Sequence, residues 1–264
     1  MSRSVPLVAV ALAVLAVAAC DFQPGGLAGS PVALGTFTTG RAGTTYSMQP
    51  IIGFYRVTGA VFVNTAFVTD TCFEAPYADT TSQNSNASLA ISAGDYVVLA
   101  VSGRSDTLRR SSTVDPFYRV GGGLSIPFTP GDSMVITVKG DPNGFPASTF
   151  RGKTAEPFTF GPITKPADGN PITITWSPAG VGGSAILVAL RFASGTSTTI
   201  DRQVACTLVD DGTATIPGTT ILNWLRATKH DVVGQRLRSI LQQVDVPRSY
   251  FNVTSVFETS ATVP

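Results

Sequence analysis

The side chains that most often perform catalysis are scarce in this chain, and histidine is the scarcest. His230 is the only histidine, and it lies in the polar segment RATKHDVVG. A Ser-His-Asp triad would depend on it, but the G-x-S-x-G sequence of many such enzymes is absent. Zinc hydrolysis usually draws on two or three histidines. We therefore expect neither a triad nor a metal site, and we interpret His230 as a solvated loop residue.

A pair of carboxylates is the remaining route to hydrolysis, because glycosidases need only two of them. The glutamates are Glu74, Glu156 and Glu258. Asp210 and Asp211 are adjacent, but neighbouring side chains on a strand point to opposite faces, so the doublet is predicted to form a turn. A non-enzymatic protein is therefore the leading hypothesis, with a carboxylate-dependent glycan hydrolase as an alternative.

Other sequence motifs for cofactors and ions are missing or weak. No P-loop, G-x-G-x-x-G or C-x-x-C sequence occurs, so we expect no cofactor. Asp95 and Asp132 each follow a glycine. Because calcium needs six to eight oxygen ligands from several residues, we interpret both as turn residues.

Charge argues against nucleic acid as a partner. The formal net charge is +1, and the densest basic cluster, Arg104 with Arg109 and Arg110, is interrupted by Asp106. Binding to a phosphate backbone needs a basic stripe. We expect no nucleic-acid binding.

The beginning of the chain indicates export and lipid attachment. A short basic head precedes an uncharged apolar run from Val5 to Ala19, shorter than the roughly 20 residues that a helix needs to cross a bilayer. Val17-Ala18-Ala19-Cys20 resembles the lipobox of bacterial lipoproteins. The resemblance implies that residues 1–19 are a cleaved signal peptide and that Cys20 carries a lipid anchoring the protein, outside the cytoplasm, to the cell membrane or outer membrane. An ordinary signal peptide and an uncleaved anchor are the alternatives.

Two further cysteines, Cys72 and Cys206, remain once Cys20 is lipidated. Both lie among alternating residues, in FVTDTCFE and VACTLV. In an oxidising envelope such a pair favours a disulfide. The alternative is two separate buried thiols, because cysteines whose Cα atoms lie more than about 7 Å apart cannot be bridged.

The rest of the chain is predicted to be β-structure. Charged residues are only 13%, about half the usual share of roughly 25%, and hydrophobic residues alternate with polar ones over most of the length. GDYVVLAVSG (Gly94 to Gly103) and GDSMVITVKG (Gly131 to Gly140) share a pattern that predicts a Gly-Asp turn followed by a strand. We predict a flexible tether over residues 20–31 and two domains, 32–164 and 165–264.

Several local elements are predicted in the second domain. Residues 172–176 and 186–192 are predicted to pair as one hairpin, and VACTLVDDGTATIP as another. The spacing of apolar residues from Val233 to Val244 predicts a helix, and TTILNWLRA a helical turn. Residues 250–257 are predicted to form a strand whose buried side contains Phe251, Val253, Ser255 and Phe257.

These elements lead to an all-β fold. PITITWSP followed by VACTLVDDGTATIP is similar to the C-terminal modules of uncharacterised bacterial envelope lipoproteins, over about residues 165–264. The short strands and Trp176 fit immunoglobulin-like β-sandwich modules. We therefore expect two such modules, with one or two short helices near the C-terminus; the resemblance implies a location and a fold but no reaction.

The expected function is a structural or binding role at the cell envelope. Partners would be the membrane, through the lipid at Cys20, and an envelope protein or glycan. Tyr46, Tyr55 and Tyr77 are the candidate ligand-contact aromatics. Tyr77 begins a long polar stretch, EAPYADTTSQNSNAS, which is interpreted as either a contact site or a mobile loop. A carbohydrate- or protein-binding module is the alternative to a purely structural role.

Overall fold

The regular secondary structure of the described residues is almost entirely β-strand, which confirms the all-β expectation. The computed structural model describes residues 29–57, 69–77, 90–195, 197–244 and 249–263. Cys20 and the rest of residues 1–28 lie outside these ranges. Within the described residues α1 (Leu222–Arg226) is the only α-helix, and it falls in the TTILNWLRA segment for which the sequence predicts a helical turn.

The larger of the two sheets contains 13 strands of the described chain. In spatial order it consists of β3 (Thr71–Pro76), β13 (Arg202–Val209), β12 (Ser184–Phe192), β15 (His230–Val244), β16 (Ser249–Ala261), β1 (Ser30–Ala42), β2 (Thr45–Val57), β6 (Phe117–Val120), β5 (Arg104–Arg109), β4 (Val97–Val101), β8 (Ser133–Val138) and β9 (Ser148–Lys153), while β7 (Ile126–Phe128) pairs with β2.

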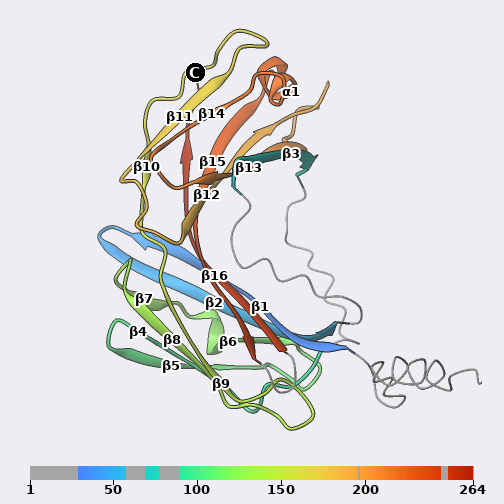
Figure 1. The fold of residues 1–264 in the computed structure, drawn as a ribbon, viewed down its shortest axis with the longest axis vertical. Helices are drawn as coiled ribbons and strands as arrows, with labels where there is room; N and C mark the ends of the chain where they lie inside the picture. The colour runs from blue at the N-terminus through green and yellow to red at the C-terminus, as the bar shows by residue number, and fades with distance from the viewer. Residues whose placement is uncertain (1–28, 58–68, 78–89, 196, 245–248, 264) are drawn as a thin grey trace, which may run out of the picture.

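Two long strands join the two lobes that are visible in Figure 1. β15 and β16 pair antiparallel from Val232 opposite Ala261 to Val244 opposite Ser249, and they extend from the lobe with β11 and α1 to the lobe with β4 to β9. β1 lies parallel to β16 and antiparallel to β2. Because β1 begins at Ser30, the last two residues of the predicted tether, Ser30 and Pro31, belong to the sheet.

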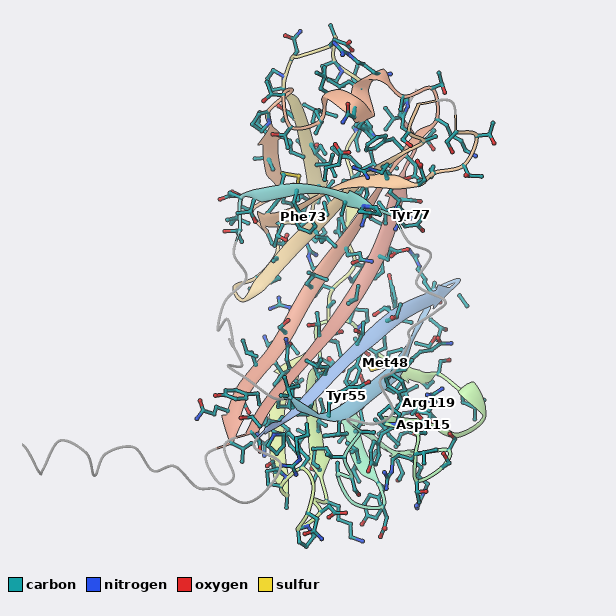
Figure 2. All side chains as sticks on the ribbon, turned by 90° about the vertical axis from the view of Figure 1, so that its right-hand side faces the viewer. Met48, Tyr55, Phe73, Tyr77, Asp115 and Arg119 are labelled. Carbon is teal, nitrogen blue, oxygen red and sulfur yellow. A yellow bond between two sulfur atoms is a disulfide. The ribbon has the colours of Figure 1, made fainter. Side chains whose placement is uncertain are left out.

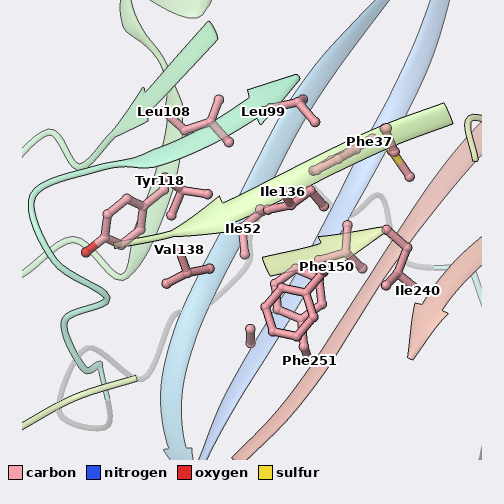
Figure 3. Packing of buried hydrophobic residues seen from close by; sticks show 14 of the residues in the cluster. Phe37, Ile52, Leu99, Leu108, Tyr118, Ile136, Val138, Phe150, Ile240 and Phe251 are labelled. Atoms are coloured by element: carbon pink, nitrogen blue, oxygen red, sulfur yellow. The ribbon is translucent and has the colours of Figure 1, made fainter. Parts of the chain in front are cut away.

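The first core fills the lobe with β4 to β9, and Figure 3 shows its packing. Phe150 and Phe251 stack with ring centroids 3.6 Å apart, and Phe54 contacts the ring of Tyr118 edge-on at 5.1 Å. The two G-D-x-x-V-x-x-V-x-G segments supply neighbouring strands of this lobe, since β4 pairs antiparallel with β8 from Val97↔Val138 to Val101↔Met134.

The second core lies between the larger sheet and a smaller one. The smaller sheet consists of β10 (Thr159–Phe160), β11 (Ile172–Ser177) and β14 (Thr213–Ile216). Trp176 and Ile216 from this sheet pack in one cluster with Leu190 and Phe257 from the larger sheet, and Trp224 of α1 is also fully buried there. This lobe is therefore two facing sheets with α1 at one end (Figure 1).

The two hairpins predicted in this region are wrong. β11 pairs with β10 and β14, whereas β12 pairs with β13 and β15. β14, the return strand of the second predicted hairpin, likewise pairs with β11 rather than β13. The connection from β11 to β12 and the connection from β13 to β14 therefore each carry the chain from one sheet to the other. All four strands contribute apolar side chains to the second core, which the two sheets share.

The helix predicted over Val233 to Val244 is also wrong, because this segment is most of strand β15. Burial alternates along it, and antiparallel pairing with β12 and β16 provides the hydrogen bonds. Gly234 faces the second core, where an added Cβ would lie 2.3 Å from Cζ of Phe160. The apolar residues of this segment recur at spacings of three and four residues, but the pairing of β15 with strands on both sides decides its structure instead.

Each core receives residues from both sides of the predicted boundary at 164/165. Phe158 and Ile163 pack in the second core, and Ile240 and Phe251 pack in the first. The prediction for the last strand is confirmed: Phe251, Val253, Ser255 and Phe257 are all buried in β16.

Candidate functional site

The three candidate tyrosines do not form one surface. Tyr46 is half-buried between the cores, against Phe128 and Phe257. Tyr55 is half-buried on β2, 6.2 Å from the ring of Phe117, and its pKa is raised by burial and by the charge of Asp115. Figure 2 shows Tyr77 at the end of β3 in the other lobe.

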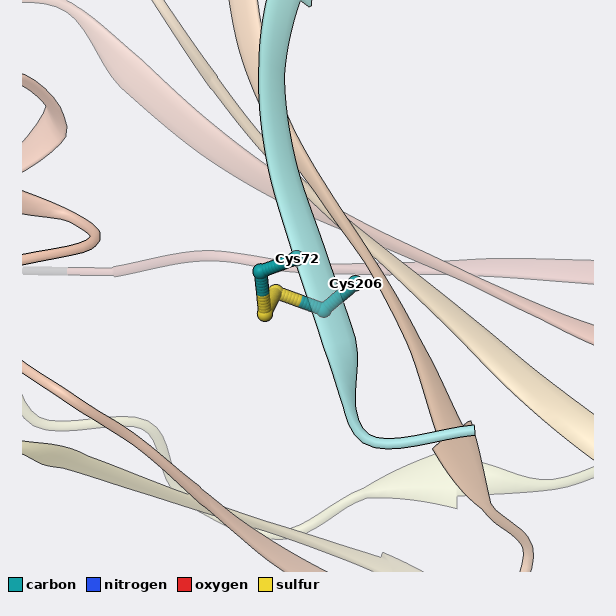
Figure 4. Close-up of a disulfide and its surroundings, with 2 residues drawn as sticks. All are labelled: Cys72 and Cys206. Atoms are coloured by element: carbon teal, nitrogen blue, oxygen red, sulfur yellow. A yellow bond between two sulfur atoms is a disulfide. The ribbon is translucent and has the colours of Figure 1, made fainter. Parts of the chain in front are cut away.

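A disulfide holds the strand that leads to Tyr77. The sulfur atoms of Cys72 and Cys206 are 2.05 Å apart and their Cα atoms 4.1 Å apart, as Figure 4 shows. The two residues are directly opposite each other in the β3–β13 pair. An exposed ion pair between Glu74 and Arg202, at 2.8 Å, lies on the same two strands. The position of β3 on the sheet therefore depends on a covalent bond as well as on strand pairing.

Tyr77 lines a pocket of about 400 Å³ on the side of the larger sheet opposite the second core. Its apolar lining residues are Leu187 and Ala189 from β12 and Val233 from β15. Its polar lining residues are Arg191, Gln203, Gln235 and Glu258. We call this site the Tyr77 pocket. Polar groups placed beside apolar side chains are typical of sites that orient a small ligand.

Arg191 is the distinctive group of the Tyr77 pocket. Its guanidinium carbon lies 4.6 Å from the centre of the Tyr77 ring, a distance typical of a cation–π contact. Its Nε is buried without a hydrogen-bond partner, and so is Oδ1 of Asp231, which is the cross-strand neighbour of Arg191. Burial raises the pKa of Asp231, while the positive charge of Arg191 opposes that rise.

The opposite end of the Tyr77 pocket carries an amide and a carboxylate. Nε2 of Gln235 donates a 2.7 Å hydrogen bond to Oε2 of Glu258. A second amide, Gln203 on β13, lies at the other end, as the cross-strand neighbour of Arg191. Hydroxyl groups of a ligand can both donate to the carboxylate and accept from the amides. The chemistry of the pocket therefore suits a polar ligand with one apolar side.

A second arginine centre lies between the two cores and was not predicted from the sequence. The side chains of Arg236 and Asp210 are almost completely buried, 0% and 2% exposed. Nε and Nη2 of Arg236 donate to the two carboxylate oxygens of Asp210 at 2.7 and 2.9 Å. Trp176 and Ser184 donate to the same carboxylate at 2.8 and 2.6 Å.

The remaining donors of Arg236 bind main-chain carbonyls. Nη1 donates to Pro157 at 3.2 Å, and Nη2 donates to Pro178 at 2.6 Å. The guanidinium also lies 5.1 Å from the ring centre of Phe158. Burial alone would raise the pKa of Asp210, but the hydrogen bonds from Arg236, Ser184 and Trp176 outweigh it and hold that pKa below its usual value.

Arg238, two residues along the same face of β15, forms a similar centre. Its Nε and Nη2 donate to the two carboxylate oxygens of Glu156 at 2.7 and 2.6 Å. Its other bonds go to the carbonyls of Val181 and Gly182. The two arginines therefore hold the connections before β10 and between β11 and β12 against β15. Both arginines lie on the buried side of β15.

The turn predictions agree with the structure. Asp95 is exposed and pairs with Lys139 at 2.7 Å, and Asp132 accepts a hydrogen bond from Ser102. Asp211 accepts from the backbone N–H of Thr213 and closes the turn. Asp210, Asp211 and Gly212 connect β13 to β14. Within this turn the side chain of Asp210 is buried, whereas that of Asp211 is exposed.

His230 is the first residue of β15 rather than a solvated loop residue. Its ring centre is 5.0 Å from that of Trp224, and its Nε2 is buried without a hydrogen-bond partner. Burial lowers its pKa. The strand begins at His230 because the side chains of Val232 and Val233, which follow it, are buried in the sheet.

The glutamates lie apart, and each accepts a hydrogen bond from a different group. Glu74 accepts from Arg202 and Asn223, at the rim of a polar hollow of about 470 Å³ beside α1. Glu156 accepts from Arg238 and Glu258 from Gln235. Among the described residues, no three His, Cys, Asp or Glu side chains are close enough together to hold a metal ion.

None of the helices in the described ranges has the length and hydrophobicity needed to cross a bilayer. Comparisons with protein-family models, curated proteins and solved structures find no match to this chain.

Proposed function

We propose that this protein is a lipid-anchored, extracytoplasmic β-sandwich protein that binds a ligand at the cell envelope through the Tyr77 pocket. The observation that carries the binding role is the pocket itself, where Arg191 lies against an aromatic ring beside apolar side chains. A charged donor at such a place can orient a ligand that accepts hydrogen bonds.

The location is supported by two independent features. The Val17-Ala18-Ala19-Cys20 sequence resembles a lipobox, although Cys20 lies outside the described residues. The Cys72–Cys206 disulfide favours an oxidising compartment such as a bacterial periplasm or cell surface. Immunoglobulin-like modules remain part of this proposal, and the two facing sheets around the second core support it for the lobe with β11 and α1.

Lipid attachment is tested by growing cells that produce the full chain with an alkyne-labelled fatty acid and following the label on the protein. We expect the wild-type chain to be labelled and Cys20→Ala to lose the label and leave the membrane fraction. The double variant Cys72→Ala with Cys206→Ala is the control, because it removes the other cysteines without leaving an unpaired thiol and should keep the label. Labelling of Cys20→Ala, or a wild-type chain without label, would contradict the anchor.

A further inference from the structure

The Tyr77 pocket has an anion-binding end. We infer that it takes a sugar that carries a carboxylate, a hexuronate, and that Arg191 recognises the carboxylate; this inference rests on the proposed binding role. The guanidinium is held against Tyr77 at 4.6 Å, so its plane is restrained before a ligand arrives. A restrained guanidinium loses less entropy on binding than a mobile one.

The guanidinium of Arg191 favours a carboxylate ligand over a neutral one. The two Nη groups of a guanidinium form a fork that matches the two oxygens of a carboxylate. The Nε of Arg191 is buried, so its Nη groups are the donors that a ligand in the pocket would meet. Asp231 gives Arg191 a counter-charge across the strands, and no hydrogen bond joins its Oδ1 to the guanidinium. The fork of Arg191 therefore stays available.

The rest of the Tyr77 pocket favours a hydroxylated ring as the body of that ligand. A sugar ring has one side of C–H groups, which can pack against Leu187, Ala189 and Val233. Gln203, Gln235 and Glu258 offer donors and acceptors for hydroxyl groups. Glu258 also repels a second anionic group at the end of the pocket where it lies. A single carboxylate next to Arg191 is therefore the matching charge pattern.

The test is titration of the purified full chain with D-glucuronate, D-galacturonate and their uncharged methyl esters, followed by ligand-observed NMR and calorimetry. At least one uronate should bind about tenfold or more tightly than its methyl ester, since a hydrogen bond to a charged group contributes about 1.5–3 kcal/mol. Arg191→Met should weaken uronate binding about 10- to 100-fold and remove the preference over the ester. Arg191→Lys keeps the charge but not the fork, and should recover only part of the affinity.

Arg109→Met is the matched control. Arg109 is an exposed arginine 5.5 Å from the ring centre of Tyr96 in the other lobe, so this variant removes an arginine from a tyrosine without touching the pocket. It should bind uronates as the wild type does. Thermal unfolding of each variant distinguishes lost binding from lost folding.

Three results would overturn the inference. Equal binding of uronate and ester would remove the carboxylate specificity and leave the proposed binding role standing. A preference that survives in Arg191→Met would remove the role of Arg191. Absence of uronate binding would reject the ligand class, and the anchoring part of the proposed function would then still be decided separately by the Cys20→Ala experiment.

Discussion

Two arginines of the larger sheet lie on neighbouring strands and have opposite surroundings. Arg236 on β15 is completely buried, and all three of its nitrogens donate hydrogen bonds to Asp210 or to main-chain carbonyls. Arg191 on β12 is half-buried against Tyr77, and its Nε has no partner. A saturated buried ion pair fixes local structure, whereas an unsaturated arginine beside a pocket is available to a ligand. The difference separates a structural centre from a candidate site within one sheet.

The largest effect should come from breaking the saturated centre. Asp210→Ala leaves Arg236 buried and unpaired, so we expect a loss of about 3–5 kcal/mol in the free energy of unfolding, measured by urea denaturation. Arg236→Met should lose a similar amount because it leaves the carboxylate of Asp210 buried. The double variant Asp210→Leu with Arg236→Met should recover part of the loss. A single-variant loss below about 1 kcal/mol would show that the pair is not the structural centre described here.

The next largest effect should come from the disulfide, which holds β3, the strand that leads to Tyr77 and the pocket of Arg191. Cys72→Ala with Cys206→Ala opens a link between residues 134 positions apart, and we expect a loss of about 2–4 kcal/mol. Hydrogen exchange should rise in β3 and leave β15 near Arg236 unchanged. Equal exchange in β3 of both proteins would mean that strand pairing alone holds Tyr77 in place.

A smaller effect, of opposite sign at the two centres, should appear with pH. The pKa of Asp210 is lowered on folding, so its contribution is present above the unfolded value of about 3.8 and is lost as pH falls through the folded pKa. The pKa of Asp231 is raised on folding. Its ionisation therefore destabilises the folded state as pH rises above the unfolded value of about 3.8, and this loss is complete above the folded pKa. Asp231→Asn should therefore stabilise the protein at pH 7 and lose that gain near pH 3. Unfolding curves at both pH values measure the change, and a destabilised Asp231→Asn at pH 7 would contradict it.

The smallest effect on stability should come from Arg191. Arg191→Met keeps an unbranched chain over Tyr77. It removes a buried donor that has no partner, which stabilises the fold, and it also removes the cation–π contact with Tyr77, which destabilises it. Because the two effects oppose each other, we expect a net change within about 1 kcal/mol. Urea denaturation alongside Arg236→Met makes the comparison direct. A loss above about 2 kcal/mol would place Arg191 among the structural residues.

Parts of the fold and site were predictable because they depend on local pattern. Alternation identified β16 and its buried residues Phe251 and Phe257, and glycine followed by aspartate identified the turns before β4 and β8. The sheet-switching connections were not predictable, because a strand pattern does not say which sheet a strand joins. The Tyr77 pocket was found only in part: Tyr77 was a candidate ligand-contact aromatic, whereas no local pattern singled out Arg191, the one charged residue of β12.

By itself the sequence determined the class of structure, the likeness of residues 17–20 to a lipobox, and the pair of cysteines whose partnership stayed open. Only the tertiary structure decided that Cys72 lies opposite Cys206, that residues 233–244 form a strand, and that Arg236 is saturated while Arg191 is not. The physical reason is that alternation and turn chemistry act between near neighbours in the chain. The hydrogen-bond partners of a buried charge are carbonyls and carboxylates from segments distant in the sequence, and no local sequence pattern predicts which segments these are.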